Sequence, residues 1–162
     1  MINTFNPREI IEIAINIEEN GRKLYQTLED KTKKEKLKSM YKYLKEQEEI
    51  HGKVFQEMLD NIGECIVHEF NLGEFEAYLR AIASEYIFTQ ELIDEKIEKG
   101  FGDGLEAVEF GIFVEKESIL TYSALREYVL PGKQVALDKI ISEERKHLIS
   151  LVALKDFLKK EG

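Results

Sequence analysis

Apolar side chains recur every three or four residues along four long stretches of the sequence, the spacing that places them on one face of an α-helix. Residues that favour helix ends bound these stretches: Asn6-Pro7 opens the first, and Pro131-Gly132 separates the last two. No convincing strand alternation accompanies them. The pattern predicts an all-α fold with long helices at about residues 7–30, 33–61, 103–128 and 133–160.

Short turns join the first long helix to the second and the third to the fourth, so each pair is expected to form an antiparallel hairpin. Roughly forty residues separate the hairpins, enough for a crossover along the bundle, with short helices expected at about 74–84 and 86–99. The prediction is a single domain over residues 1–162, a four-helix bundle with one long crossover containing short helices between the second and third long helices.

One constellation of acids, tyrosines and histidines occurs twice, once in each predicted hairpin. A glutamate is followed seven residues later by a tyrosine and about thirty residues later by a Glu-x-x-His motif. The first copy is Glu18, Tyr25, Glu48 and His51, and the second is Glu115, Tyr122, Glu144 and His147. Two lone glutamates and two Glu-x-x-His helices form the ligand set of a carboxylate-bridged di-metal centre in a four-helix bundle.

Glutamate is abundant in this chain, so a Glu-x-x-His motif can occur by chance. The helix face on which each acid lies decides whether it is a candidate metal ligand. In all four predicted helices the acid falls within the apolar stripe; Glu115, for example, shares its face with Val108, Ile112 and Ile119. An unpaired carboxylate at such a position is costly or is forced to take up a proton. Bound metal would account for six convergent polar groups, and the alternative is a set of buried acid–histidine hydrogen bonds.

The expected ligands divide between two ions because residues three apart lie on the same helix face. We expect one metal to bind Glu18 and His51, the other Glu115 and His147, with Glu48 and Glu144 between them. Mixed carboxylate and imidazole ligands suit iron or manganese better than a structural zinc site. The predicted cofactor is therefore a pair of iron ions, with manganese as the alternative.

Two tyrosines and two small residues accompany the lone acids. Tyr25 and Tyr122 are candidate catalytic residues that would hydrogen-bond to the metal ligands or take part in redox chemistry. The alternative is a pair of core tyrosines whose hydroxyls have found partners. Gly21 and Ser118 follow the acids by three positions, where they would leave room beside the metals or serve ordinary helix packing.

The net charge of −9 and the pI near 5.0 argue against nucleic acid and anionic membranes as partners. No apolar run approaches membrane-span length and the amino terminus lacks the build of a signal peptide, so a cytoplasmic protein is expected. Cys65 is the single cysteine, and His68 is expected to be solvated. A lysine-rich run over residues 31–38 is expected to be a solvated face, with docking of an acidic electron-donor protein as the alternative.

Four segments of the chain resemble the rubrerythrin-like branch of the ferritin-like superfamily: EENGRKLY (18–25), EQEEIHGKVFQEML (46–59), EKESILTY (115–122) and SEERKHLISL (142–151). The resemblance implies a di-iron bundle, often a homodimer, that handles H2O2 or O2. It implies that the acids and histidines of the repeated constellation are the metal ligands.

The chain departs from that family's pattern in two respects. Full rubrerythrins carry a cysteine-ligated rubredoxin domain that supplies electrons, and Cys65 alone cannot form one, so an external electron donor is expected. Their third long helix also carries a second glutamate three residues after the first, where this chain has Ser118. Glu117 does not replace it because it points off the ligand face. Peroxide reduction by the usual route is therefore in question.

Three classes of function remain open at this level. The first is a di-iron oxidase or peroxidase acting in oxidative-stress defence. The second is a protein that binds and handles iron, which would load more metal than one site holds. The third is a non-catalytic helical protein with a structural di-metal site, which would lose stability on chelation.

Overall fold

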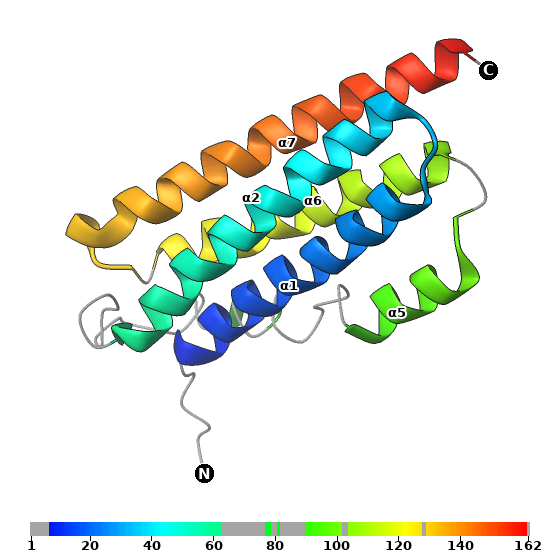
Figure 1. Cartoon of the computed structure of the whole chain (residues 1–162). Helices are drawn as coiled ribbons and strands as arrows, with labels where there is room; N and C mark the ends of the chain where they lie inside the picture. Colours follow the sequence, from blue (N-terminus) through cyan, green and yellow to red (C-terminus); the bar gives the residue numbers. More distant parts are fainter. Residues whose placement is uncertain are drawn as a thin grey trace.

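A computed structural model describes residues 7–62, 77, 78, 81, 90–101, 104–127 and 129–161. The long helices are α1 (Pro7–Lys31), α2 (Glu35–Asp60), α6 (Gly104–Arg126) and α7 (Gln134–Glu161). A shorter helix, α5 (Gln90–Lys99), precedes α6, and a single 3-10 turn, η1 (Pro131–Lys133), precedes α7. The four long helices form the predicted bundle, with α5 lying outside it beside α1 (Figure 1).

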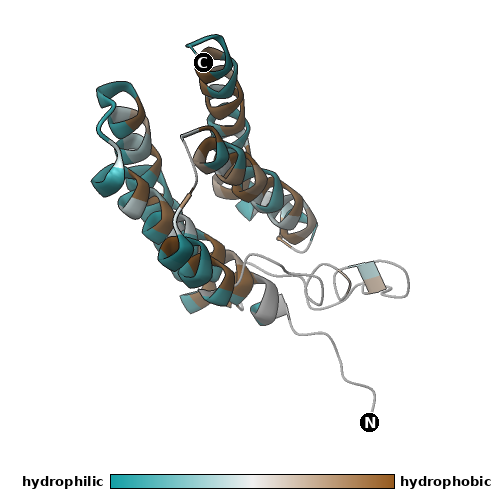
Figure 2. Ribbon diagram, turned by 90° about the vertical axis from the view of Figure 1, so that its right-hand side faces the viewer, coloured by the Kyte–Doolittle hydropathy of each residue, from teal (hydrophilic) through white to brown (hydrophobic). Residues whose placement is uncertain are grey.

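Each predicted hairpin is present, and the closest packing lies within the hairpins. Helix α1 packs along α2, and α6 packs along α7. The two hairpins face each other through residues that are almost fully buried, among them Ile17, Leu44, Val114 and Leu151. In Figure 2 each long helix carries both polar and apolar stretches, as expected when one face lies in the core and the other in solvent.

The helix boundaries differ from the expected ones by a few residues. Lys34 keeps an extended backbone (φ −86°, ψ 113°), so α2 begins at Glu35 rather than Lys33. Helix α6 ends at Arg126, two residues before the predicted end at Tyr128, because backbone bonds from Glu127 and Val129 reach back only three residues. These short bonds tighten the chain into the turn before Pro131.

Helix α5 is the described part of the predicted crossover and matches the second of its two expected short helices. It ends at Lys99, and the next residue, Gly100, has a φ of +74° in the left-handed region that favours glycine and an N–H that bonds to the carbonyl of Lys96 at 2.9 Å. Most of the other expected helix, at 74–84, lies outside the described residues, as do Asn6, Cys65 and His68. None of the described helices is both long enough and apolar enough to span a membrane.

Candidate metal centre

The bundle core contains an acidic and histidine-rich layer near the middle of its length. All six side chains of the two predicted ligand sets are at most 2% exposed, although all four helices also carry exposed acids. Every long helix contributes to this layer. The members are Glu18 from α1, Glu48 and His51 from α2, Glu115 from α6, and Glu144 and His147 from α7.

Glu144 occupies the centre of this layer. Its Oε1 atom lies 2.8 Å from Nδ1 of His51, and its Oε2 atom lies 3.0 Å from Nδ1 of His147. The two imidazole rings are stacked, with centroids 5.9 Å apart. One carboxylate therefore connects two histidines that come from different hairpins.

Each histidine also approaches one of the lone glutamates. Nδ1 of His51 is 3.6 Å from Oε2 of Glu18, and Nδ1 of His147 is 3.7 Å from Oε2 of Glu115. These contacts complete two groups, Glu18–His51–Glu144 and Glu115–His147–Glu144, in which the possible ligand atoms all lie within 4.8 Å of one another. The two groups share Glu144, as expected for a carboxylate between two ions.

Two buried carboxylate oxygens without hydrogen-bond partners indicate whether a metal ion fits this layer. Among the described residues, Oε2 of Glu18 and Oε2 of Glu115 are buried without any hydrogen-bond partner. They occupy equivalent positions in the two groups, and each faces a histidine Nδ1. A buried carboxylate oxygen without a partner is costly, and a cation beside each would satisfy both. The donor set, four carboxylates and two imidazoles, suits iron or manganese.

Glu48 lies at the edge of the layer and belongs to neither three-residue group. Its carboxylate fits against the backbone of α1, because a Cβ built on Gly21 would lie 2.8 Å from its Cδ and Oε2 atoms. Burial, followed by repulsion from Glu18 and Glu144, raises the pKa of Glu48 well above its usual range. Its predicted place between the metals remains a prediction.

The pKa shifts show how the layer is held without metal. Burial, followed by repulsion from Glu144, raises the pKa of Glu115 well above its usual range and also raises that of Glu18. Burial alone would lower the pKa of the two histidines, but hydrogen bonds to their carboxylate neighbours raise it to about 11 for His51 and about 9 for His147. The metal-free layer therefore holds protons where cations would otherwise balance its charge.

The carboxylate of Glu144 behaves in the opposite way. Burial acts to raise its pKa, but hydrogen bonds from His147 and His51 outweigh burial and lower that pKa below its usual range. Glu144 thus stays ionised between two protonated imidazoles.

Tyr25 and Tyr122 bond across the bundle rather than within their own hairpins. The hydroxyl of Tyr25 on α1 donates to Oε1 of Glu115 on α6 at 2.6 Å, and that of Tyr122 on α6 donates to Oε1 of Glu18 on α1. Burial, followed by the nearby carboxylates, raises both tyrosine pKa values well above their usual range. Both phenols therefore remain protonated donors that fix the outer oxygens of the lone glutamates.

One contact of the layer, between His51 and Glu143, was not predicted from the sequence. Nε2 of His51 lies 3.0 Å from Oε2 of Glu143, a residue that immediately precedes Glu144. A carboxylate on the second ring nitrogen orients a histidine ligand and favours one tautomer. The only signal in the sequence was the doubled glutamate of Glu-Glu-x-x-His, which a surface position would explain equally well.

Ser118 occupies the position where the resemblance leads one to expect a second glutamate. It is 2% exposed, and its hydroxyl donates to the backbone carbonyl of Val114 at 3.1 Å. The side chain is therefore committed to its own helix.

A small cavity of about 220 Å³ reaches the layer from the outer side of the α1–α2 hairpin. Glu18 and Glu48 line its inner end. Two ion pairs line its mouth, Arg22 with Glu19 at 2.8 Å and Lys53 with Glu49 at 2.8 Å. Its size suits ions and molecules of a few atoms.

Comparisons with known proteins agree with this geometry. The family model described as Rubrerythrin matches residues 9–155. A crystal structure from Thermotoga maritima, described as a ferritin-like diiron-carboxylate protein, superposes with a TM-score of 0.71. That protein is 25% identical to this chain, and the match covers 94% of this chain and 95% of the other. No curated protein sequence gives a significant match.

Proposed function

The chain belongs to the rubrerythrin family, and on that premise we propose that it is a di-iron carboxylate protein that reduces H2O2 or O2 with electrons from an external donor. The observation that carries the proposal is the arrangement around Glu144. Two histidines bind its two oxygens, and two equivalent carboxylate oxygens, on Glu18 and Glu115, face those histidines without partners.

The residues of the layer would hold the metals as two nearly equivalent sets. Glu18 and His51 would bind one ion, Glu115 and His147 the other, and Glu144 both, with Glu48 completing the site from α2. Bound iron would supply Lewis acidity and electrons for reduction of the oxidant. The charges agree, because four carboxylates balance two divalent ions.

The surrounding side chains prepare the carboxylates for this role. Tyr25 and Tyr122 hold the outer oxygens of Glu115 and Glu18, so the Oε2 atoms remain directed at the histidines. Glu143 holds the far side of the His51 ring. The cavity between α1 and α2 offers a route of suitable size for a metal ion or a small oxidant.

Metal content tests the proposal directly. Purified protein and the Glu144→Ala variant are loaded anaerobically with Fe(II) or Mn(II), and bound metal is counted per chain. We expect about two ions per wild-type chain and a large loss in the variant, because Glu144 belongs to both groups. Folded wild-type protein that takes up neither metal would leave a non-catalytic helical protein.

The oxidant is then identified by the rate at which the reduced, loaded protein is reoxidised. Stopped-flow measurements with H2O2 and with O2 at equal concentration distinguish a peroxidase from an oxidase. We expect slow turnover with peroxide relative to rubrerythrins, since Ser118 stands where they carry an exchanging glutamate. Iron uptake far beyond two ions per chain would favour the iron-handling alternative.

A homodimer is part of the proposal. Tyr43 and Ile50 on α2 and Ile149 and Val152 on α7 are between 41% and 68% exposed, which is unusual for large apolar side chains on neighbouring helices. Light scattering coupled to size-exclusion chromatography measures the mass, and a monomer at micromolar concentration would contradict this part of the proposal.

A further inference from the structure

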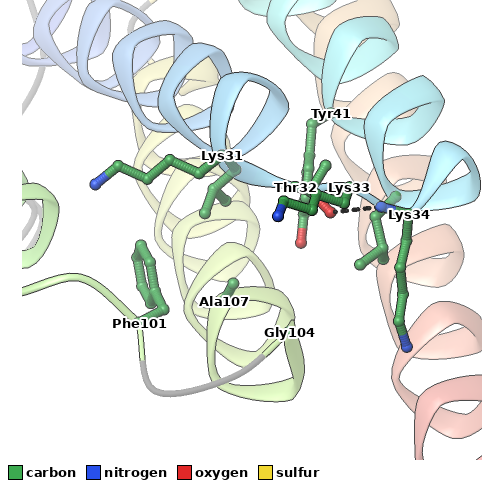
Figure 3. A pocket seen from close by; sticks show the side chains of 10 residues that line it. Lys31, Thr32, Lys33, Lys34, Tyr41, Phe101, Gly104 and Ala107 are labelled. Atoms are coloured by element: carbon green, nitrogen blue, oxygen red, sulfur yellow. Dashed lines mark hydrogen bonds between the residues drawn. The ribbon is translucent and has the colours of Figure 1, made fainter.

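A second cavity, unrelated to the route into the metal layer, lies at the end of the bundle where α1 turns into α2. Its volume is about 320 Å³, and its walls come from the α1–α2 turn, the first turns of α2, and the start of α6 (Figure 3). The apolar part of its wall is formed by Leu28, Leu37, Phe101 and Ala107. The volume falls at the lower end of the range for small-molecule sites.

The wall of this cavity contains a buried polar group without a hydrogen-bond partner. Tyr41 lines it and is only 2% exposed, yet no described residue hydrogen-bonds to its hydroxyl. Tyrosine side chains on a helix lean toward the helix amino terminus, so the phenol of Tyr41 is carried toward the first turn of α2. Figure 3 shows the hydroxyl end of its ring beside the α1–α2 turn. A buried hydroxyl of this kind is costly unless it has a partner, which a ligand would provide.

The rim of the same cavity is positively charged. Lys31, Lys33 and Lys34 all line it. Lys31 donates to the carbonyl of Ile97 at 3.2 Å, and Lys34 lies 3.7 Å from Glu161 across exposed surface. Lys33 forms no ion pair with any carboxylate of the described chain. The ammonium group of Lys33 can therefore receive an anion, and that of Lys34 is held only by one long ion pair.

The first turn of α2 adds to this preference for negative charge. Its N-cap residue, Lys34, makes no side-chain cap hydrogen bond, so the first backbone N–H groups of the helix have no such acceptor. The nearest side-chain acceptor, the hydroxyl of Thr32, bonds instead to the N–H of Lys34 itself at 3.3 Å. An uncapped helix start attracts anions because of its backbone dipoles.

We propose that this cavity, which we call the turn pocket, binds a small organic anion with an apolar body. Its anionic head accepts hydrogen bonds from the Tyr41 hydroxyl and lies beside Lys33 at the uncapped start of α2. Its body covers the apolar wall of Leu28 and Phe101. The inference concerns residues outside the metal layer and holds whether or not the proposed redox function is correct.

The turn pocket is nevertheless connected to the metal layer. The ring of Tyr41 stacks on that of Tyr25, with centroids 6.3 Å apart and planes inclined by 16°, and Tyr25 donates to Glu115. An occupant bonded to Tyr41 is therefore separated from a predicted metal ligand by two aromatic rings.

Anilinonaphthalene sulfonate, which joins an apolar aromatic body to one anionic group and fluoresces on binding, is a suitable probe. Phenylnaphthylamine, the same aromatic body without the sulfonate, is the matched neutral probe. Both are titrated into the full-length protein as purified. We expect one site per chain for the sulfonate and at least tenfold weaker binding of the neutral probe, since charge-assisted hydrogen bonds are lost.

Variants locate the binding site. Tyr41→Phe removes only a hydroxyl that has no partner, so the fold is retained, and we expect the dissociation constant of the sulfonate to rise about tenfold. Lys33→Glu should weaken binding strongly at low salt and less at high salt. Lys42→Glu, an equal charge reversal on the exposed side of α2, should leave binding unchanged.

The inference is overturned if the sulfonate does not bind, if the two probes bind equally, or if wild type and Tyr41→Phe bind the sulfonate equally. A uniform loss in all three variants would also overturn it, because Lys42 lies outside the turn pocket.

Discussion

Nε2 of His51 lies 3.0 Å from a carboxylate oxygen of Glu143, on the ring nitrogen that does not face Glu144. The second histidine has no equivalent contact, since Nε2 of His147 is buried without a hydrogen-bond partner among the described residues. The two histidines therefore make similar contacts through Nδ1, which faces Glu144, and different contacts through Nε2.

Removing the outer contact should weaken metal binding at the site of His51. For Glu143→Ala we expect Mn(II) affinity to fall about 10- to 100-fold, because the ring loses the group that orients it. Glu143→Gln keeps a hydrogen-bond acceptor but not the charge, so its Mn(II) affinity should lie between those of Glu143→Ala and wild type. Competitive titration against a chelator of known affinity measures both. Glu57→Gln, an exposed acid on α2, is the control, and an equal loss there would contradict a role specific to Glu143.

Two glycines of the α1–α2 hairpin provide a matched pair of substitutions. A Cβ on Gly21 would lie 2.8 Å from the carboxylate of Glu48, whereas a Cβ on Gly52 would meet only Cβ of Glu18 at an ordinary 3.6 Å. Gly21→Ala should displace the Glu48 carboxylate and reduce the number of metal ions bound. Gly52→Ala should retain metal and stabilise the protein by up to about 1 kcal/mol, the gain in helix propensity.

Metal counting and thermal unfolding check these outcomes together. Normal metal content in Gly21→Ala would show that Glu48 is not needed for binding.

The hydroxyl of Tyr25 should contribute to the unfolding free energy, whereas that of Tyr41, whose ring stacks on Tyr25, should not. Tyr25→Phe leaves Oε1 of Glu115 without its donor, and we expect the metal-free protein to lose about 1–3 kcal/mol of unfolding free energy. Tyr41→Phe removes a buried hydroxyl with no partner and should be neutral or slightly stabilising. Denaturant unfolding measures both, and equal effects would contradict the assignment of the Tyr25 bond.

The metal-free protein should lose stability as the pH rises. The pKa of His51 increases from 6.5 to about 11 on folding and that of His147 to about 9. A raised pKa stabilises the fold fully below the unfolded value and progressively less as the pH passes through the folded value. The unfolding free energy of chelated protein should therefore fall between pH 6.5 and 9 and continue to fall toward pH 11.

The raised pKa values of Glu48 and Glu115 act in the same direction, since the metal-free fold favours their protonated forms. Urea unfolding of chelated protein at several pH values measures the slope. A stability that is constant or rises over this range would contradict the protonated state of the histidines.

Metal uptake should release these protons. The histidine nitrogens and carboxylates must be deprotonated to bind cations, so affinity should fall as the pH falls. Calorimetry of Mn(II) binding in buffers with different ionisation enthalpies counts the protons released. Glu144 should contribute none, because its pKa is lowered and it is already ionised. Binding without proton release would show that the metal-free layer is not protonated.

Much of this molecule follows from local patterns in its sequence. Hydrophobic periodicity predicted the four long helices, and it placed the acid and histidine of each Glu-x-x-His motif on the buried face. The boundaries were less accurate because they depend on single residues, such as the extended backbone of Lys34.

Contacts between distant residues could not be predicted in this way. That Tyr25 bonds to Glu115 rather than to an acid of its own hairpin depends on which helices face each other across the core. The bond between Glu143 and His51 depends likewise on how α7 is rotated toward α2. The turn pocket joins the α1–α2 turn and the start of α2 to Phe101, Gly104 and Ala107 from a distant part of the chain, and the lysine run alone is equally typical of a solvated face.

The crossed bonds of Tyr25 and Tyr122 have a consequence for the chain as a whole. Each hairpin supplies the donor for the other hairpin's glutamate, which is the exchange expected if two copies of one ancestral hairpin had paired about a twofold axis. The two hairpins thus exchange contacts as the two subunits of a symmetric dimer do, but within a single chain. In that architecture the crossover acts as a tether that sets the effective concentration of one half for the other.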